Sequence, residues 1–199
     1  MRVPEEEIAY GFKIVIVGPP AAGKTTLFNR YCFNSFNMDT KMTIGINFQS
    51  TYLKIRQRNG AAIQEKYVVN SIFDFGGQER FRPLIPKFLE GANGALLIFD
   101  SVSFTSFDKL DYWYDKLMEN TQNTQWSIPI ILVGSKSDLL DKTPQNEIVS
   151  NNLINQYVEM RNLNGYYLTS ALDNYNVLEV FKELTKLILK RHKIEAIMV

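Results

Sequence analysis

The sequence predicts an α/β fold in which a six-stranded, mostly parallel sheet carries helices on both faces. Three observations predict it. Apolar runs of strand length alternate with amphipathic segments of helix length along the whole chain. The runs 95–100 and 128–134 are nearly all apolar, as expected of central parallel strands covered on both faces. A glycine-containing loop at 18–25 joins the first strand to the first helix, in the arrangement typical of phosphate-binding loops.

Each element follows from the spacing of its apolar residues. The β-branched run 12–17 predicts a buried strand, and 24–31 predicts the helix that follows it. Two strands over 46–56 and 67–73 form a hairpin turning through 58–60. The remaining expected elements are, in chain order, a strand over 95–100, a helix over 106–120, a strand over 128–134, a helix over 145–161, a strand over 166–169 and a closing helix over 176–192.

Composition bounds the class of protein. The chain has 199 residues, of which 45% are hydrophobic and 22% charged, and its net charge of +1 gives no nucleic-acid footprint. Cys32 is the only cysteine, so an intramolecular disulfide is impossible and a cytoplasmic location is expected. We expect one domain over 10–192, a flexible segment over 1–9 and a short tail over 193–199.

Neither end of the sequence carries a recognisable membrane signal. The acidic start lacks the apolar core of a signal peptide, and no glycine follows Met1 to accept a myristoyl group. No cysteine near the C-terminus offers a site for prenylation. At most, peripheral association with a membrane is therefore expected.

Residues Gly18 to Thr25 fit the pattern G-x-x-x-x-G-K-[ST] at every fixed position. Such a loop presents a nest of backbone N–H groups at a helix N-terminus, which favours a polyphosphate. Lys24 would then reach the terminal phosphates, and the Thr25 hydroxyl would hold Mg²⁺. The loop by itself predicts only that a nucleotide's phosphates bind here.

Polar residues that follow the other strands predict the rest of the site, because ligands of such sheets bind beyond the carboxyl ends of the strands. Asp74 follows the strand 67–73 and is positioned to hold Mg²⁺. The Gly77 N–H is a donor for a terminal phosphate, and Gln78 is a candidate to orient an attacking water.

Two further segments are suited to reading a base. The carboxylate of Asp138 can accept two hydrogen bonds from the N–H groups of guanine, which adenine cannot supply. The small residues Thr169, Ser170 and Ala171 let backbone N–H groups reach the carbonyl of the base.

On these motifs the chain resembles the small GTPases of the Ras superfamily, and the Rab branch most, over about residues 10–192. Residues 43–48 resemble the first switch and the strand after it, and 73–82 resemble the third G-motif and second switch. Residues 91–100 resemble the segment leading into the family's fourth strand. The resemblance implies a P-loop NTPase G domain that binds GTP and hydrolyses it to GDP, with switch loops that effectors recognise.

The resemblance also implies a role for each matching position. Thr43 would coordinate Mg²⁺ and the γ-phosphate, Phe36 would lie across guanine, and Lys136 would pack along it. The implied nucleotide-binding residues are Gly18, Ala21, Ala22, Gly23, Lys24, Thr25, Thr26, Phe36, Thr43, Gly77, Ser135, Lys136, Asp138, Ser170, Ala171 and Leu172. The implied metal ligands are Thr25, Thr43 and Asp74, with Mg²⁺ as the cofactor, and the implied catalytic residues are Gln78 and Lys24.

The implied partners are GTP and GDP, effector proteins, an exchange factor and a GTPase-activating protein. Phe48, Phe73 and Phe88 match an aromatic triad that Rab proteins present to effectors, and core packing is an equally good interpretation for each of them. No arginine lies in the phosphate loop, so slow intrinsic turnover is expected, with acceleration by a partner's arginine.

Departures from the family's pattern leave alternatives open. Pro19 and Pro20 lack N–H groups and stiffen the loop, so a GTP-binding module with little or no hydrolysis is an alternative. Ser135 replaces a usual Asn, which predicts weaker nucleotide retention, and Leu172 replaces a common Lys near the base. A P-loop ATPase or kinase is a third interpretation, but it leaves Asp138 and Phe36 without roles.

Overall fold

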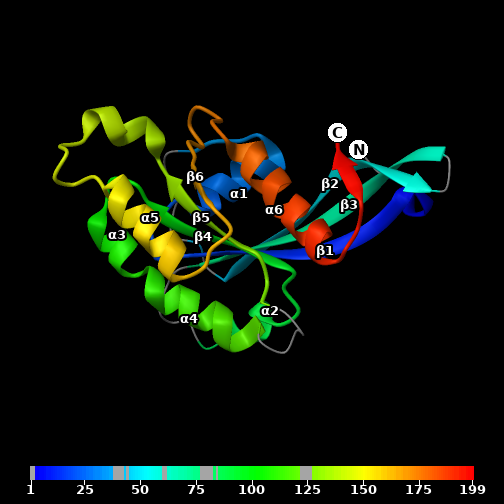
Figure 1. The fold of residues 1–199 in the computed structure, drawn as a ribbon. Coiled ribbons are helices and arrows are strands. Elements are labelled where there is room, and N and C mark those ends of the chain that lie inside the picture. Colours follow the sequence, from blue (N-terminus) through cyan, green and yellow to red (C-terminus); the bar gives the residue numbers. More distant parts are fainter. Residues whose placement is uncertain are drawn as a thin grey trace.

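The structure, a computed structural model, describes residues 3–37, 43, 45–59, 62–76, 83, 85–121 and 127–199. Its centre is a seven-stranded sheet in the order β6-β5-β4-β1-β3-β2-β7 (Figure 1). The strands are β1 Ile8–Val17, β2 Ile46–Asn59, β3 Ala62–Phe75, β4 Gly94–Asp100, β5 Ile130–Ser135, β6 Tyr166–Leu168 and β7 Ala196–Met198. β1 pairs in parallel with β3 and β4, and β5 pairs in parallel with β4 and β6. The α/β class and mostly parallel sheet are thus confirmed.

The number of strands differs from the prediction, because the sheet has seven strands rather than six. The additional strand, β7, pairs antiparallel with residues 55–57 of β2 (Figure 1). β7 has only three residues and lies within the segment expected to be a short tail, where no turn signal or neighbouring element marked a strand. Its formation depends on the edge of β2, which supplies the hydrogen-bonding partners.

Helices cover both faces of the sheet. The α-helices are α1 Lys24–Phe33, α2 Ile85–Leu89, α3 Phe104–Asp108, α4 Leu110–Thr121, α5 Asn151–Met160 and α6 Val177–Arg191. α1 and α6 cover one face, and α2 to α5 lie on the other (Figure 1). Alternate residues of β1 serve the two cores, with Ile14 and Ile16 packing in the first and Val15 and Val17 in the second.

Two predicted helices begin or divide elsewhere than expected. The segment 106–120 forms two helices, and Ser103 caps α3 by accepting a hydrogen bond from the Ser106 N–H. The segment 145–161 becomes helical only from Asn151, where Ser150 accepts from the Leu153 N–H. In both cases a serine side chain competes for helical N–H groups and sets the start of the helix.

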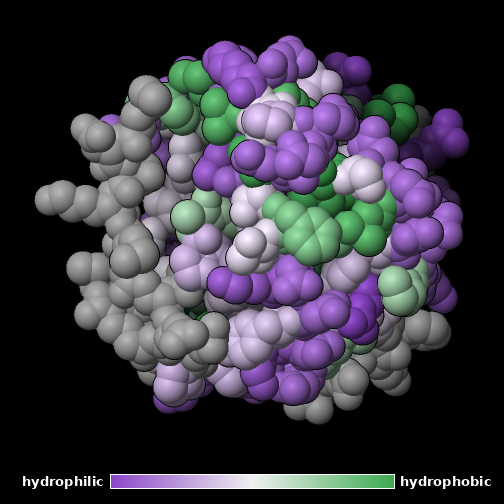
Figure 2. Space-filling model, turned by 90° about the vertical axis from the view of Figure 1, so that its left-hand side faces the viewer, coloured by the Kyte–Doolittle hydropathy of each residue, from purple (hydrophilic) through white to green (hydrophobic). Residues whose placement is uncertain are grey.

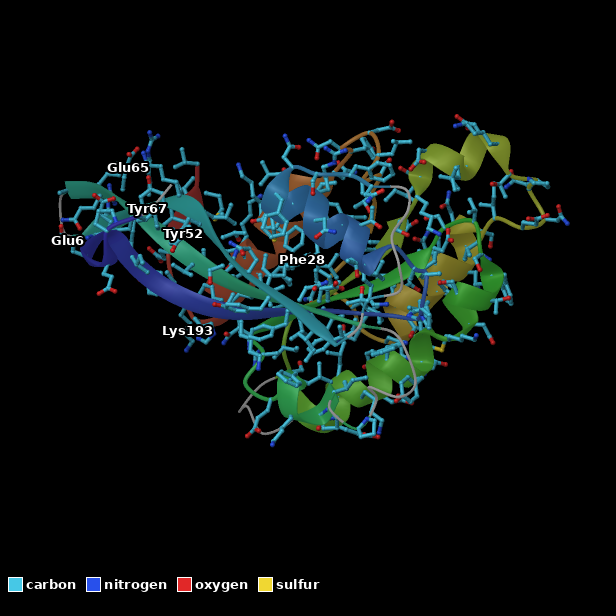
Figure 3. The ribbon with its side chains drawn as sticks, turned by 180° about the vertical axis from the view of Figure 1, so that it is seen from behind. Glu6, Phe28, Tyr52, Glu65, Tyr67 and Lys193 are labelled. Atoms are coloured by element: carbon cyan, nitrogen blue, oxygen red, sulfur yellow. The ribbon has the colours of Figure 1, made fainter. Side chains whose placement is uncertain are left out.

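The β2–β3 hairpin is longer than predicted and extends away from the helices. Its register runs from Ile46 opposite Phe75 to Asn59 opposite Ala62. In Figure 3, Tyr52, Glu65 and Tyr67 of this hairpin lie at one end of the molecule together with Glu6, whereas Phe28 of α1 lies over the sheet. No helix in the described part of the chain is long and apolar enough to cross a membrane.

Candidate functional site

A cavity of about 500 Å³ lies beyond the carboxyl ends of the parallel strands. The loop after β1, the N-terminal half of α1, the loop after β5 and the loop after β6 all contribute to its wall. Figure 2 views the molecule from this side, and apolar and weakly polar side chains gather near the middle of the face, between hydrophilic ones. The fold therefore brings together segments that are far apart in the sequence.

The loop from Gly18 to Gly23 depends on glycine at both ends. Gly18 has a φ of +147°, and a Cβ there would come within 2.1 Å of the Ile98 carbonyl oxygen. Gly23 has a φ of +81°, and a Cβ there would lie 3.0 Å from the Ser135 Oγ. Ala21, between them, also has a positive φ, of 61°. The turn is thus tightly wound, and within it the Ala22 N–H donates to the Pro19 carbonyl oxygen at 3.4 Å.

Lys24 is a buried cation at the start of α1. Its side chain is 5% exposed, and its Nζ donates to the Pro19 carbonyl oxygen at 2.7 Å. Burial lowers the pKa of Lys24 to about 8, and the neighbouring Asp74 partly opposes that change. The Nζ also lies 5.8 Å from the centroid of the Trp113 ring. An anionic ligand at this position would stabilise the ammonium.

Asp74 lies at the end of β3 with its two oxygens in different situations. Oδ2 accepts hydrogen bonds from the Thr25 hydroxyl at 2.6 Å and from the Asn47 amide at 3.0 Å. Oδ1 is buried and has no hydrogen-bond partner. Burial raises the pKa of Asp74, against the effects of Thr25, Asn47 and Lys24. An unpartnered carboxylate oxygen inside a protein calls for a cation or a water.

Thr43 completes this group of oxygens. Its hydroxyl lies 2.6 Å from the Thr25 hydroxyl, within hydrogen-bond distance. Gly76 approaches its backbone closely, because a Cβ at Gly76 would come within 2.5 Å of the Thr43 carbonyl oxygen. Two hydroxyls and a carboxylate, all hard oxygen donors, are the ligand types that Mg²⁺ prefers. The three predicted metal ligands are therefore together in the structure.

The other end of the cavity carries paired polar groups. The Asp138 Oδ1 accepts a hydrogen bond from the Ser170 hydroxyl at 2.6 Å, and Ser170 accepts in turn from the Asp173 N–H at 3.0 Å. The Lys136 ammonium forms an ion pair with Asp100 at 2.7 Å. Lys136 itself has a φ of +58°, so the backbone turns sharply at this residue, two positions before Asp138. The hydrogen bond from Ser170 thus fixes the orientation of the Asp138 carboxylate.

Ser135 connects the two ends of the cavity. Its hydroxyl oxygen lies 2.7 Å from the Ala22 carbonyl oxygen and 3.1 Å from that of Phe99, so its single proton is shared between the two acceptors. The contact with Ala22 holds the loop 18–25, and the contact with Phe99 holds the Ser135 side chain against the end of β4. Ser135 thus makes, through a short side chain, a brace between the loop after β5 and the loop after β1.

Most of the predicted site residues line the cavity. Those that do so are Ala21, Gly23, Lys24, Thr25, Thr26, Phe36, Thr43, Ser135, Lys136, Asp138, Ala171 and Leu172, and Pro20 joins them. Gly18, Ala22, Asp74 and Ser170 support this wall from behind. Gly77 and Gln78 lie outside the residues that the structure describes. The two residues predicted to act on a terminal phosphate and a water therefore remain sequence-based predictions.

Several residues of the site were not predicted. Leu139 and Lys142 line the cavity just after Asp138, and Asn37 follows Phe36. Their positions next to predicted residues were the available signal. Asn47 and Asp100 act by holding Asp74 and Lys136, and no local pattern marks such partners.

The three aromatic residues of the predicted effector triad differ in burial. Phe48 is 55% exposed, whereas Phe73 and Phe88 are half-buried and pack against a hydrophobic core. The rings of Phe48 and Phe73 lie 4.9 Å apart between centroids. Phe73 and Phe88 thus make core contacts while remaining partly accessible, and Phe48 is an exposed aromatic on β2.

The family profile and the similar proteins found by comparison all come from Ras-related proteins. The sequence profile of the Ras family matches residues 13–190. The "Ras-related protein RABA1b" of Arabidopsis thaliana is 35% identical over 182 residues, which cover 90% of this chain and 76% of the relative. The "Ras-related protein Rab-32C" of Dictyostelium discoideum is 33% identical, with 93% and 76% covered. The "Ras-related protein rab-11.1" of Caenorhabditis elegans is also 33% identical, with 90% and 78% covered.

Proposed function

The chain belongs to the Ras family, most similar to its Rab-related members, and from that premise we propose that it is a cytoplasmic switch that binds and slowly hydrolyses GTP. The observation that carries the proposal is that one cavity holds Lys24 at one end and Asp138 at the other. A buried cation suits phosphates, and a carboxylate suits the N–H edge of guanine. The arrangement matches both halves of a guanine nucleotide.

At the phosphate end, the proposed role of Lys24 is to exchange one partner for another. Its ammonium is already desolvated and donates to the Pro19 carbonyl oxygen. A phosphate oxygen would replace that neutral acceptor with a charged one, which forms a stronger hydrogen bond. The N–H groups of the loop and of the first turn of α1 would share the remaining phosphate charge.

We propose that Thr25, Thr43 and Asp74 hold Mg²⁺ beside the phosphates. Support comes from the unpartnered Oδ1 of Asp74 and from the close approach of the two hydroxyls. When bound, Mg²⁺ would neutralise negative charge that develops on the transferred phosphoryl group. The ordering of Thr43 would then depend on the terminal phosphate, which is the basis of a switch that effectors, an exchange factor and an activating protein can read.

At the base end, we propose that Asp138 reads guanine while Ser170 fixes its orientation. Phe36 and Lys136 would enclose the base, with the Lys136 ammonium tied to Asp100. A carboxylate rejects adenine because adenine offers an acceptor where guanine offers a donor, which leaves the carboxylate unpaired.

Hydrolysis would require Gln78 to orient a water toward the terminal phosphate. Pro20 lines the cavity, and the proline ring stiffens the loop. This position is the reason to keep a second candidate function, that of a module that binds GTP with little or no turnover. An arginine supplied by a partner is the proposed route to fast hydrolysis.

A combined binding and single-turnover experiment tests the proposal. The chain, freed of nucleotide, is titrated with GDP, GTP and ATP in the presence of Mg²⁺, and phosphate release from bound GTP is followed over hours. We expect binding of GDP and GTP but not ATP, and slow release of phosphate. Equal affinity for ATP and GTP would contradict the proposal that Asp138 recognises guanine. GTP binding without any phosphate release would favour the second candidate.

A further inference from the structure

Arg30 of α1 lies outside the cavity but contacts two of its walls. Its side chain is half-buried. Its Nε donates to the Ala171 carbonyl oxygen at 2.6 Å, and its Nη2 donates to the Leu172 carbonyl oxygen at 3.3 Å. Ala171 and Leu172 line the base end of the cavity. The guanidinium is therefore bound to the backbone of one wall from behind.

The same guanidinium contacts the segment that carries the opposite wall. Its carbon lies 5.8 Å from the centroid of the Phe36 ring, in the arrangement of a cation–π contact. Its Nη1 donates to both the backbone and the side-chain oxygen of Asn34, at 3.2 Å each. Asn34 is the C-cap of α1 and has a φ of +50°, so the chain changes direction there before Phe36.

We propose that Arg30 is a positioning residue for the nucleotide base, which holds Phe36 and the Ala171–Leu172 backbone at a fixed separation. This inference rests on the proposed function, because it assigns a role within the same cavity. A planar guanidinium suits the task, since its donors point in several fixed directions within one plane. A lysine at this position would carry the same charge but would not hold two carbonyl groups and an aromatic ring together.

The inference accounts for how the base end keeps its shape in this chain. Leu172 is 43% exposed and offers no polar side chain toward a base, so its backbone is the part that must be positioned. Phe36 is half-buried, and its segment is joined to α1 through the cap at Asn34. Arg30 touches both regions and so couples them.

The test uses the rate at which a fluorescent GDP analogue dissociates from the full chain. Arg30→Ala is expected to raise that rate about tenfold, the effect of losing one charge-assisted hydrogen bond. Arg30→Lys should lie between the variant and the wild type. Arg56→Ala is the matched control, because Arg56 forms an exposed ion pair with Glu65 on the β2–β3 hairpin. That control should dissociate GDP at the wild-type rate.

A double-mutant cycle separates positioning from a general loss of stability. In a Phe36→Ala background, Arg30→Ala should raise the rate by clearly less than in the wild type, because the contact with Phe36 is already absent and only those with the Ala171 and Leu172 backbone remain to be lost. An equal effect in both backgrounds, or no effect of Arg30→Ala on GDP dissociation, would overturn the inference. Failure of the wild type to bind GDP at all would instead overturn the proposed function.

Discussion

The charged groups at the two ends of the cavity differ in burial and in their hydrogen-bond partners. At the phosphate end, Lys24 and Asp74 are 5% and 0% exposed, and burial moves both pKa values toward the neutral forms. At the base end, Asp138 and Lys136 are half-exposed, and each already has a side-chain partner, Ser170 and Asp100. Desolvation thus disfavours the charged forms at the first end, whereas side-chain partners and solvent stabilise the charged groups at the second.

The difference indicates how affinity and selectivity are divided. A desolvated ammonium gains most from an anionic ligand, so the phosphate end should supply most of the binding free energy. The base end gains little from charge that is already paired, but its orientation is fixed, so it should supply discrimination. The five predictions that follow test this division, from the largest expected effect to the smallest.

Removing the buried cation should have the largest effect. Lys24→Ala is expected to lower the affinity for GDP about hundredfold or more, because it leaves Asp74 and the phosphates without a desolvated counter-charge. Isothermal titration with GDP measures this. Lys142→Ala is the matched control, since Lys142 lines the same cavity but is exposed. Similar losses in the two variants would show that burial is not what matters.

Changing the base-reading carboxylate should alter selectivity more than total binding capacity. Asp138→Asn is expected to weaken GDP about hundredfold, because an acceptor becomes a donor, and to favour xanthosine diphosphate. Competition between the two diphosphates measures the ratio. Ser170→Ala, which keeps the Asp138 carboxylate but removes the hydroxyl that bonds to it and to the Asp173 N–H, should have a smaller effect in the same direction. Unchanged preference in Asp138→Asn would place the base elsewhere.

The lowered pKa of Lys24 predicts a pH dependence of binding. Bound phosphate raises the pKa of a neighbouring ammonium, so binding requires a protonated Lys24. With a pKa of about 8 in the free protein, the protonated fraction, and with it the affinity, should fall about tenfold from pH 7 to pH 9. Titrations at several pH values measure this, and Lys24→Ala should lack the step.

The same shift predicts the opposite trend for folding of the nucleotide-free protein. The folded-state pKa of Lys24, about 8, lies below its ordinary value of 10.5, so the unfolded state binds more protons between these values. The contribution of Lys24 to the free energy of unfolding should therefore rise with pH between about 8 and 10.5. Denaturant titrations at several pH values would detect it as a free energy of unfolding that rises in the wild type relative to Lys24→Ala between about pH 8 and 10.5.

The brace between the two ends should give the smallest effect. Ser135→Ala removes the buried hydroxyl whose proton is shared between two carbonyl oxygens and is expected to lower the free energy of unfolding by about 1–2 kcal/mol. It should also speed GDP dissociation several-fold. Ser150→Ala, which removes the N-cap of α5, is the control, because a similar loss of about 1 kcal/mol should leave dissociation unchanged. Equal dissociation rates in the two variants would mean that Ser135 does not couple the ends.

Features with a strong local pattern could be predicted from the sequence. The strands β4 and β5 are nearly all apolar because both of their faces are covered, and the loop 18–25 carries its glycines at fixed spacings. The sequence also predicted that Lys24, Thr25 and Asp138, which follow strands, would lie at one site, and all three line the cavity. Such features depend on neighbours in the chain.

Features that depend on distant partners could not be predicted. Asp100 acts on Lys136, 36 positions away, and Arg30 acts on Ala171, 141 positions away. On α1, Arg30 has the ordinary appearance of a polar residue on an amphipathic helix. The strand β7 is similar, since three residues become a strand only where β2 offers an unpaired edge.

The pairing of β7 with β2 also bears on how this chain avoids association with itself. A long strand at the edge of a sheet exposes a row of N–H and C=O groups, which can template the addition of a strand from another molecule. β7 covers residues 55–57 of the fourteen-residue β2 and leaves only three residues of its own as the new edge at that place. At residues 55–57, β7 thus occupies the hydrogen-bonding edge of β2 to which another strand could otherwise add.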